Sequence, residues 1–373
     1  MGLFLPIQDG GWTPSTLPRT TTWTFDYNAA LTLQAEELGF DLVFGLAQWA
    51  SKGGYGGATK YREISLDSFM VTAALAAATK RILLLSTLHV LYGPWHPVHL
   101  AKFGATLDHI AKGRWGINIV TGYAAREPAM FGMQKAEHDR RYEMANVFVT
   151  RLEQLWSMTE NLTVDGPFWA MEDAFVTPKP RFGRPILVSA GGSPAGVAYG
   201  ARYSDLMFIT SPAGNQIEDA VASLPAHVAA IHAAAAQAGR QVRTIINPMV
   251  LCRDTEREAV AYRDAIEAAA DEVAVENFAE HGRRGDAQSW RNQRRLHRAI
   301  GGNLHLVGSP QQIVDSFLKL KNAGVDGVQL TFYDFAVDLE HFGRKVLPLM
   351  YEAGLRVADD AVPSVPLAPA ISG

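Results

Sequence analysis

The feature that most constrains this chain is a regular alternation of short β-rich runs with longer segments of helical periodicity. Such alternation is typical of parallel strands joined by crossover helices. The predicted strands, each flanked by Gly, Pro or polar turn residues, are Gly2–Ile7, Leu42–Leu46, Arg81–Val90, Arg114–Thr121, Pro185–Ala190, Asp205–Thr210, Thr244–Cys252 and Gly327–Phe332. This many units predict closure into an α/β fold of the (β/α)8 TIM-barrel type, with the chemistry on loops at the carboxyl ends of the strands.

The alternative is an open, doubly wound sheet. Such a sheet normally carries a Gly-rich turn after its first strand, whereas residues 6–11 lack the G-x-G-x-x-G spacing. No G-x-x-x-x-G-K-[ST] occurs either. The barrel is therefore preferred. We expect one domain over residues 1–357 and a flexible or oligomer-contacting tail over 358–373.

The bulk properties point to a small-molecule partner. A net charge of −4 and a pI near 6.3 give no overall attraction to nucleic acid or to an acidic membrane surface. The single cysteine, Cys252, cannot form an internal disulfide, and it is expected to be a buried structural thiol. Without a basic-then-apolar leader or a long apolar run, the chain is predicted to be cytoplasmic.

Three connections are longer than a barrel needs, which indicates insertions near its carboxyl-end face. Ala47–Ser65 carries a Gly-rich stretch, and Ala124–Glu137 should border the mouth. Asp254–Asn303 combines an alanine-rich helix with a basic run from Arg283 to Arg298. This third connection is an insertion that could form a lid, whereas a solvated charged face is the more common explanation of such a basic run.

A strand that breaks at two glycines before Ser193 and Pro194 suggests an anion site. Ser193 suits a helix N-cap and Pro194 the first helical position, so the free N–H groups of that turn could hold a phosphate. The same turn is also an ordinary way to begin a barrel helix. Arg141 and Tyr142 would add a guanidinium and a phenol suited to phosphate oxygens, or else lie in a surface ion pair.

Polar residues interrupt two predicted strands that should be buried on both faces. Asn118 and Thr121 lie in the fourth strand, and Thr87 and His89 lie near the end of the third. Buried polar groups need hydrogen-bond partners. A ligand ring edge, an internal water or the neighbouring backbone would each supply them.

A metal site is not expected. His89, His96 and His99 lie close together in the sequence, but no carboxylate or thiol pattern completes a ligand set and H-E-x-x-H is absent. Hydrogen bonding or substrate contact is the more common role of such histidines.

Seven blocks of this sequence resemble the bacterial-luciferase-like flavin monooxygenases, most closely the branch of the pyrimidine, dimethylsulfone and alkanesulfonate monooxygenases. The pyrimidine monooxygenase pattern is the nearest. The blocks are Gly2–Trp12, Gly113–Tyr123, Arg140–Tyr142, Gly191–Ser193, Leu306–Pro310, Gln329–Phe335 and His341–Leu349. The chain departs from the pyrimidine pattern at Gln48 and Tyr123, where that pattern has a lysine and a tryptophan.

The resemblance implies a flavin site. Ala47 and Gln48 would border the flavin, while Asn118 would hydrogen-bond the ring edge with Glu127 nearby. The phosphate and ribityl end would be held by Arg141, Tyr142, Gly192 and Ser193. The residues expected to take part in the chemistry are Thr87, His89, Asn118 and Tyr123.

The resemblance also implies a two-component reaction. FMNH2 would come from a separate NAD(P)H-dependent flavin reductase, and O2 would be used to oxygenate and cleave a small organic substrate. Aromatic residues near the mouth favour a pyrimidine-like N-heterocycle or amide over a sulfone or alkanesulfonate; they are Trp49, Tyr55, Tyr92, Trp95 and Tyr123. The alternatives are a deazaflavin-dependent oxidoreductase and a non-catalytic flavin-binding protein. A homodimer or homotetramer is expected.

Overall fold

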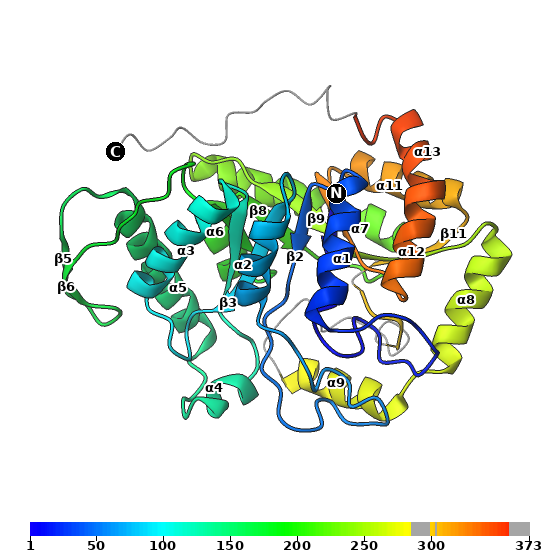
Figure 1. Cartoon of the computed structure of the whole chain (residues 1–373), viewed down its shortest axis with the longest axis horizontal. Helices are drawn as coiled ribbons and strands as arrows, with labels where there is room; N and C mark the ends of the chain where they lie inside the picture. Colours follow the sequence, from blue (N-terminus) through cyan, green and yellow to red (C-terminus); the bar gives the residue numbers. More distant parts are fainter. Residues whose placement is uncertain (285–298, 303, 358–373) are drawn as a thin grey trace.

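A closed barrel of parallel strands forms the centre of the protein (Figure 1). The computed structural model describes residues 1–284, 299–302 and 304–357. Around the barrel the strands follow the order β1-β12-β9-β8-β7-β4-β3-β2. Their bounds are β1 Gly2–Phe4, β2 Leu42–Phe44, β3 Leu83–His89, β4 Trp115–Val120, β7 Ile186–Ser189, β8 Leu206–Ile209, β9 Arg243–Ile246 and β12 Gly327–Leu330. The predicted TIM barrel is confirmed.

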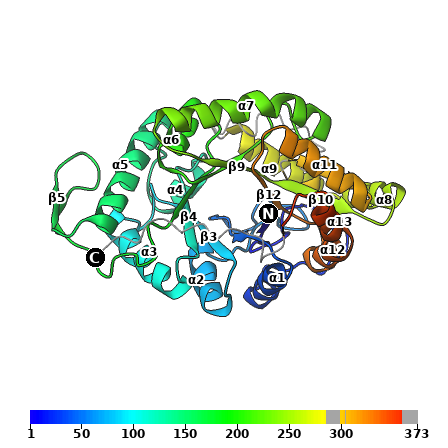
Figure 2. The ribbon, with the colours of Figure 1, turned by 90° about the horizontal axis from the view of Figure 1, so that it is seen from above.

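Helices form a ring outside the strands (Figure 2). Their bounds are α1 Phe25–Glu37, α2 Ser68–Ala78, α3 Pro97–Ala111, α4 Arg126–Met130, α5 His138–Ser157, α6 Pro194–Tyr203, α7 Ile217–Gln237, α8 Glu256–Ala268, α9 Glu272–Arg284, α11 Pro310–Asn322, α12 Phe335–His341, the π-helical turn Phe342–Val346 and α13 Leu347–Glu352. A large apolar core fills the space between helices and strands, and a smaller cluster that includes Phe44, Leu85 and Val188 fills the barrel interior. Along β2, β7 and β8 the side chains alternate between these two cores, as the β-strand period requires.

The predicted seventh strand, Thr244–Cys252, is wrong in its extent. Its first half is β9 in the barrel, whereas its second half, β10 (Pro248–Cys252), pairs in parallel with β11 (Leu304–Gly308) in a separate two-stranded sheet and keeps a parallel bridge to Thr331, just after β12. Pro248 has no N–H to donate to a ladder, so a strand break at this residue is expected. The sequence also did not reveal the antiparallel hairpin of β5 (Leu162–Val164) and β6 (Met171–Ala174).

The helices α4 and α9 lie at the end of the barrel opposite the N-terminus, where the barrel strands finish (Figure 1). Hydrogen bonds attach α9 to the connection after β2: the backbone N–H of Thr59 donates to Asp271 at 2.7 Å, and Asn277 donates to the Tyr55 carbonyl at 2.8 Å. The predicted lid therefore contains α8 and α9. The basic run up to Arg298 falls largely outside the described residues, as does the predicted tail over 358–373. None of the helices that the structure describes combines the length and apolar character that a membrane span needs.

Candidate active site

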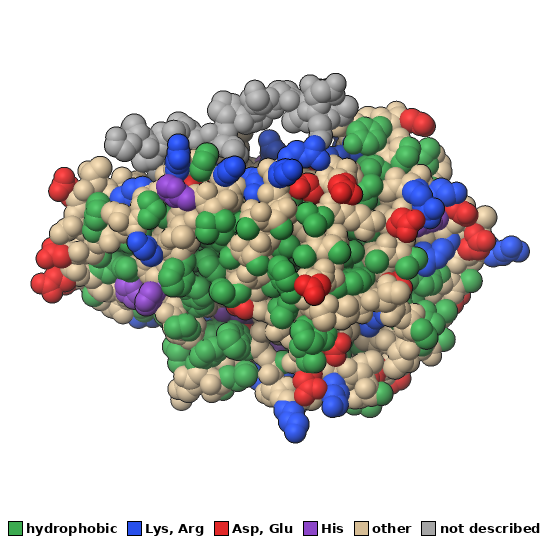
Figure 3. Space-filling view, viewed as in Figure 1, with side chains coloured by type: hydrophobic (Ala, Val, Ile, Leu, Met, Phe, Trp, Pro, Cys, Tyr) green, Lys and Arg blue, Asp and Glu red, His purple; other side chains and the backbone are tan. Residues whose placement is uncertain are grey.

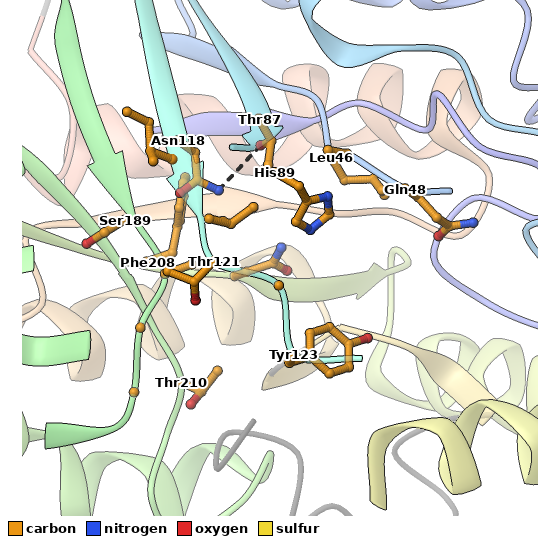
Figure 4. A pocket seen from close by; sticks show the side chains of 18 of the residues that line it. Leu46, Gln48, Thr87, His89, Asn118, Thr121, Tyr123, Ser189, Phe208 and Thr210 are labelled. Atoms are coloured by element: carbon orange, nitrogen blue, oxygen red, sulfur yellow. Dashed lines mark hydrogen bonds between the residues drawn. The ribbon is translucent and has the colours of Figure 1, made fainter. Parts of the chain in front are cut away.

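A cavity of about 330 Å³ lies at the carboxyl ends of the barrel strands (Figure 4), within the size range of small-molecule sites. Every site residue predicted from the sequence lines it: Ala47, Gln48, Thr87, His89, Asn118, Tyr123, Glu127, Arg141, Tyr142, Gly192 and Ser193. The structure therefore brings together residues from widely separated parts of the chain, while their individual roles remain predictions.

One end of the cavity has the features of an anion site. Ser193 is the N-cap of α6, and its hydroxyl accepts a hydrogen bond from the Gly196 N–H at 3.1 Å, with Pro194 in the first turn. Arg141, in the first turn of α5, is only 2% exposed and lines the same part of the cavity. A helix N-terminus and a buried guanidinium at one place favour a phosphate or another anion.

Tyr142 lies against this turn because two glycines leave room for it. A Cβ on Gly196 would lie 2.7 Å from the Tyr142 hydroxyl oxygen, and a Cβ on Gly191 would lie 3.0 Å from it. Real Cβ atoms essentially never approach a heavy atom as closely as the first of these distances. The glycines thus allow the phenol to reach the N-terminus of α6, and Tyr142 also lines the cavity.

The barrel interior contributes a pair of polar side chains. Thr87 and Asn118 stand opposite each other in the β3–β4 register, and the Asn118 amide donates to the Thr87 hydroxyl at 3.3 Å (Figure 4). Asn118 is only 3% exposed, and its Oδ1 has no hydrogen-bond partner among the residues that the structure describes. An unpaired buried carbonyl oxygen costs free energy unless a donor reaches it. A ligand with an N–H on its ring edge would provide that donor.

A second polar group surrounds His89, at the end of β3. Its Nδ1 lies 3.4 Å from Glu127 Oε2 without hydrogen-bond geometry, and the Tyr92 hydroxyl donates to the same carboxylate oxygen. The Tyr92 ring stacks on the imidazole, with centroids 5.1 Å apart. Burial lowers the pKa of His89, against the opposing effect of Glu127, and burial also raises the pKa of Tyr92. The group therefore presents a neutral imidazole that can accept a proton.

The mouth of the cavity is formed by loops and by α9. Gln48 donates to the Arg62 carbonyl at 2.8 Å, and the Tyr123 ring lies 5.5 Å from the ring of His281 on α9. Burial, together with the nearby Arg126 guanidinium, lowers the pKa of His281 to about 4. Burial also raises the pKa of Tyr123. Both side chains are therefore uncharged at neutral pH.

The aromatic residues expected to stack on a substrate divide into two groups. Tyr55 and Tyr123 line the cavity. Trp49 does not: it is 44% exposed and packs edge-on against Phe131. Trp95 packs against Phe69, and Tyr92 lies against His89. Trp49, Tyr92 and Trp95 are thus not among the residues that line the cavity, so their positions do not support stacking on a substrate there.

Several residues that line the cavity were not expected from the sequence. Asn247 is 6% exposed with an unpartnered Oδ1. In the sequence, Asn247 has the same feature as Asn118, an amide side chain in an otherwise apolar run. No comparable signal marked the others, which include Trp12, Arg62, Ser189, Phe208 and Phe278.

The remaining candidates have structural roles. His96 is the N-cap of α3, and its ring nitrogen accepts a hydrogen bond from the Val98 N–H at 3.2 Å. Across residues 1–284, 299–302 and 304–357, no three His, Cys, Asp or Glu side chains are grouped so that they could hold a metal ion. Cys252 is buried, and burial raises the pKa of its thiol to about 12.

Comparisons with known proteins agree with this geometry. The family described as luciferase-like monooxygenase matches residues 1–327. The chain is 34% identical over 358 residues to an FMNH2-dependent dimethylsulfone monooxygenase of Pseudomonas fluorescens, covering 94% of this chain and 93% of that protein. It is 33% identical over 360 residues to the pyrimidine monooxygenase RutA of Allorhizobium ampelinum, covering 94% and 95%. The crystal structure of a riboflavin lyase with modified FMN and its substrate riboflavin superposes with a TM-score of 0.82 at 22% identity, over 97% of this chain and 93% of that one.

Proposed function

Since the chain belongs to the luciferase-like monooxygenase family, we propose that it is an FMNH2-dependent monooxygenase that uses O2 to oxygenate a small organic substrate. Its partner is a separate flavin reductase that supplies the reduced FMN. Bound FMNH2 provides the electrons that activate dioxygen. The protein's own contribution is to bind and orient the reactants and to keep water out.

The anion end of the cavity suits the FMN phosphate. Ser193 and the adjoining N–H groups of α6 provide donors, Arg141 provides positive charge, and the Tyr142 phenol lies beside them. Gly192 leaves the turn open to the cavity. These residues would hold the phosphate and ribityl chain.

The barrel end suits the flavin ring. A single observation carries the proposal: one cavity joins an anion site at a helix N-terminus to Asn118, a buried amide whose oxygen has no partner. A flavin has a phosphate at one end and ring N–H groups at the other, so it satisfies both. Ala47 and Gln48 would border the ring, and Thr87 with Asn118 would orient the reacting edge.

His89 is the group best placed to move a proton. Glu127 accepts a hydrogen bond from the Tyr92 hydroxyl and lies next to the imidazole, so it would stabilise a histidine that has gained a proton. Tyr123 lies farther out and would contact the substrate. Exclusion of water falls to α9, which is bonded through Asp271 and Asn277 across the mouth.

The substrate favoured by the aromatic mouth is a planar, pyrimidine-like N-heterocycle or amide. Tyr55, Tyr123 and Phe278 line this part of the cavity and can stack on a ring. A sulfone or alkanesulfonate is the second candidate, because the dimethylsulfone monooxygenase of Pseudomonas fluorescens is similar over nearly the whole chain.

The test is oxygen uptake and product formation with FMNH2 supplied by a separate reductase, using uracil-like heterocycles, dimethyl sulfone and small alkanesulfonates as substrates. We expect product with at least one of these classes. Turnover with a reduced deazaflavin and none with FMNH2 would replace the proposal by a hydride-transfer reaction. Flavin binding without any turnover would instead support a non-catalytic flavin-binding protein.

We also propose a homo-oligomer in which helices α2 and α3 form the contact. Met70 is 67% exposed, Phe103 46% and Ile110 49%, and they line one apolar groove. Hydrophobic side chains gather on this face of the molecule, over α2 and α3 (Figure 3). Exposed apolar patches of this kind commonly mark protein–protein contacts. Phe103→Glu should shift the sedimentation of the protein toward the monomer, whereas an unchanged sedimentation coefficient would rule out this face.

A further inference from the structure

Two buried N–H donors that find no partner within residues 1–284, 299–302 and 304–357 lie side by side at the mouth of the cavity. Arg62 is 8% exposed, and its Nε has no hydrogen-bond partner. The indole Nε1 of Trp12 is likewise buried without a partner. The Arg62 guanidinium carbon lies 4.8 Å from the Trp12 ring centroid, and both side chains line the cavity. Leaving such donors unpaired costs free energy, so their position calls for an acceptor within the cavity.

The Arg62 guanidinium is held in place by the residues around it. It lies 5.1 Å from the ring centroids of both Tyr61 and Phe278, in addition to Trp12. Its Nη1 reaches the Gln48 side-chain oxygen only at the long distance of 3.5 Å. The Arg62 backbone has a φ of 60°, a left-handed conformation that is uncommon for a residue with a side chain. A residue held in this way against its local preference is often found at a ligand site.

Within the part of the chain that the structure describes, Arg62 forms no ion pair with a carboxylate. Glu127 also lines the cavity, but its carboxylate faces Tyr92 and His89. Arg126 adds a second guanidinium nearby, 4.9 Å from the Tyr55 ring centroid. Buried charges are normally paired, so an anion in this part of the cavity would be stabilised.

We infer that Arg62 and Trp12 bind a negatively charged oxygen group of the substrate, a carboxylate or a sulfonate. The Arg62 Nε and the Trp12 Nε1 donate to its oxygens. This inference rests on the proposed function, since it assigns the substrate of the same cavity. The site is separate from the phosphate site: Gln48, which bonds to Arg62, and Ser189, on the strand that leads to α6, lie on opposite sides of the cavity (Figure 4).

The test measures binding to the protein loaded with oxidised FMN, by calorimetry and by the change in flavin absorbance. The first series is uracil with a carboxylate, a sulfonate or a neutral carboxamide at ring position 6. The second is methanesulfonate against dimethyl sulfone. We expect the charged member of at least one series to bind about tenfold or more tightly than its neutral counterpart. A tighter carboxylate or a tighter sulfonate identifies the natural group.

Two arginine variants separate charge recognition from packing. Arg62→Met should abolish the preference for the charged ligand, while Arg62→Lys should retain part of it. The matched control is Arg19→Met, because Arg19 also lies over an aromatic ring, Tyr333, at 4.5 Å but does not line the cavity. This control should keep the full preference.

Equal affinity for charged and neutral ligands in the wild-type protein, or a preference that survives in Arg62→Met, would overturn the inference. FMN affinity and oxygen consumption with FMNH2 are measured on the same samples. If both persist while the charge preference is absent, the inference fails and the proposed function stands. If FMN does not bind, the proposed function itself fails.

Discussion

The two ends of the cavity are built in different ways. The anion end is formed by the first turns of α5 and α6, where regular secondary structure places Arg141 and Ser193. The mouth is formed by the loop after β2, the short helix α4 and the inserted helix α9. Between them, Thr87 and Asn118 project from barrel strands. The wall of the cavity is thus formed by regular secondary structure at the anion end and mainly by loops at the mouth.

This difference suggests a division of labour. A helix N-terminus binds phosphate whatever is attached to it, so the anion end can hold the cofactor independently of the substrate. The loops at the mouth can vary without disturbing the barrel, so substrate recognition can change while the cofactor site persists. Substitutions at the barrel centre should therefore affect the chemistry. Substitutions at the anion end should affect cofactor affinity, and those at the mouth should affect substrate choice and local stability.

The largest effect is expected at the barrel centre. Asn118→Leu keeps the volume of the side chain but removes the amide, and it should reduce product formed per oxygen consumed by about one to two orders of magnitude. FMN affinity should change little. Ile117→Leu is the packing control, because Ile117 is fully buried on the opposite face of the same strand. An unchanged product-to-oxygen ratio in folded Asn118→Leu protein would refute a chemical role for this amide.

At the anion end, Arg141→Ala should weaken FMN binding roughly tenfold or more, since it removes a charge-assisted hydrogen bond to the phosphate. Riboflavin, which lacks the phosphate, should bind as it does to the wild-type protein. The neighbouring Arg140, which is exposed and paired with Glu143, provides the control variant Arg140→Ala. Equal losses for both flavins in Arg141→Ala would show that the residue does not recognise the phosphate.

The smallest effect is expected at the mouth and depends on pH. Burial and the Arg126 guanidinium lower the pKa of His281 to about 4, so the folded state favours the neutral ring. An unfolded histidine titrates at a higher pH. The contribution of His281 to stability is therefore complete above the pKa of an unfolded histidine, about 6.5, and is lost as the pH falls toward 4.

The protection factors of the α9 amides, corrected for the pH dependence of the intrinsic exchange rate, should accordingly fall between about pH 6.5 and 4, and His281→Gln should remove part of this fall. His109→Gln is the control, because His109 is exposed and bonded to the Lys179 carbonyl outside the cavity. If exchange in α9 has the same pH dependence in His281→Gln as in the wild-type protein, His281 does not attach this helix to the mouth.

The regular parts of this protein could be predicted from its sequence because their signals are local. Strand composition and turn residues located the barrel strands, and Ser193 with Pro194 marked the start of α6. The sequence did not predict the division of the seventh strand at Pro248, because an apolar run continues on both sides of this proline. The sequence also could not show that the second half of this strand, β10, pairs with β11.

The mouth was harder to predict because its residues meet only through tertiary packing. Arg62 and Trp12 lie on different loops and contact each other across the cavity entrance. Neither has a neighbour in sequence that marks it as part of a site. Asn247 is the exception among the missed residues, since a buried amide in an apolar strand is the same signal that identified Asn118.

The most direct test of the central claim is the electron density of FMN in crystals of its complex with this protein. The account predicts the phosphate within hydrogen-bond distance of Ser193 and Arg141, and the edge of the flavin ring within hydrogen-bond distance of Asn118 Oδ1. A flavin bound in the reverse direction, or outside the cavity that these residues share, would contradict the assignment of the two ends.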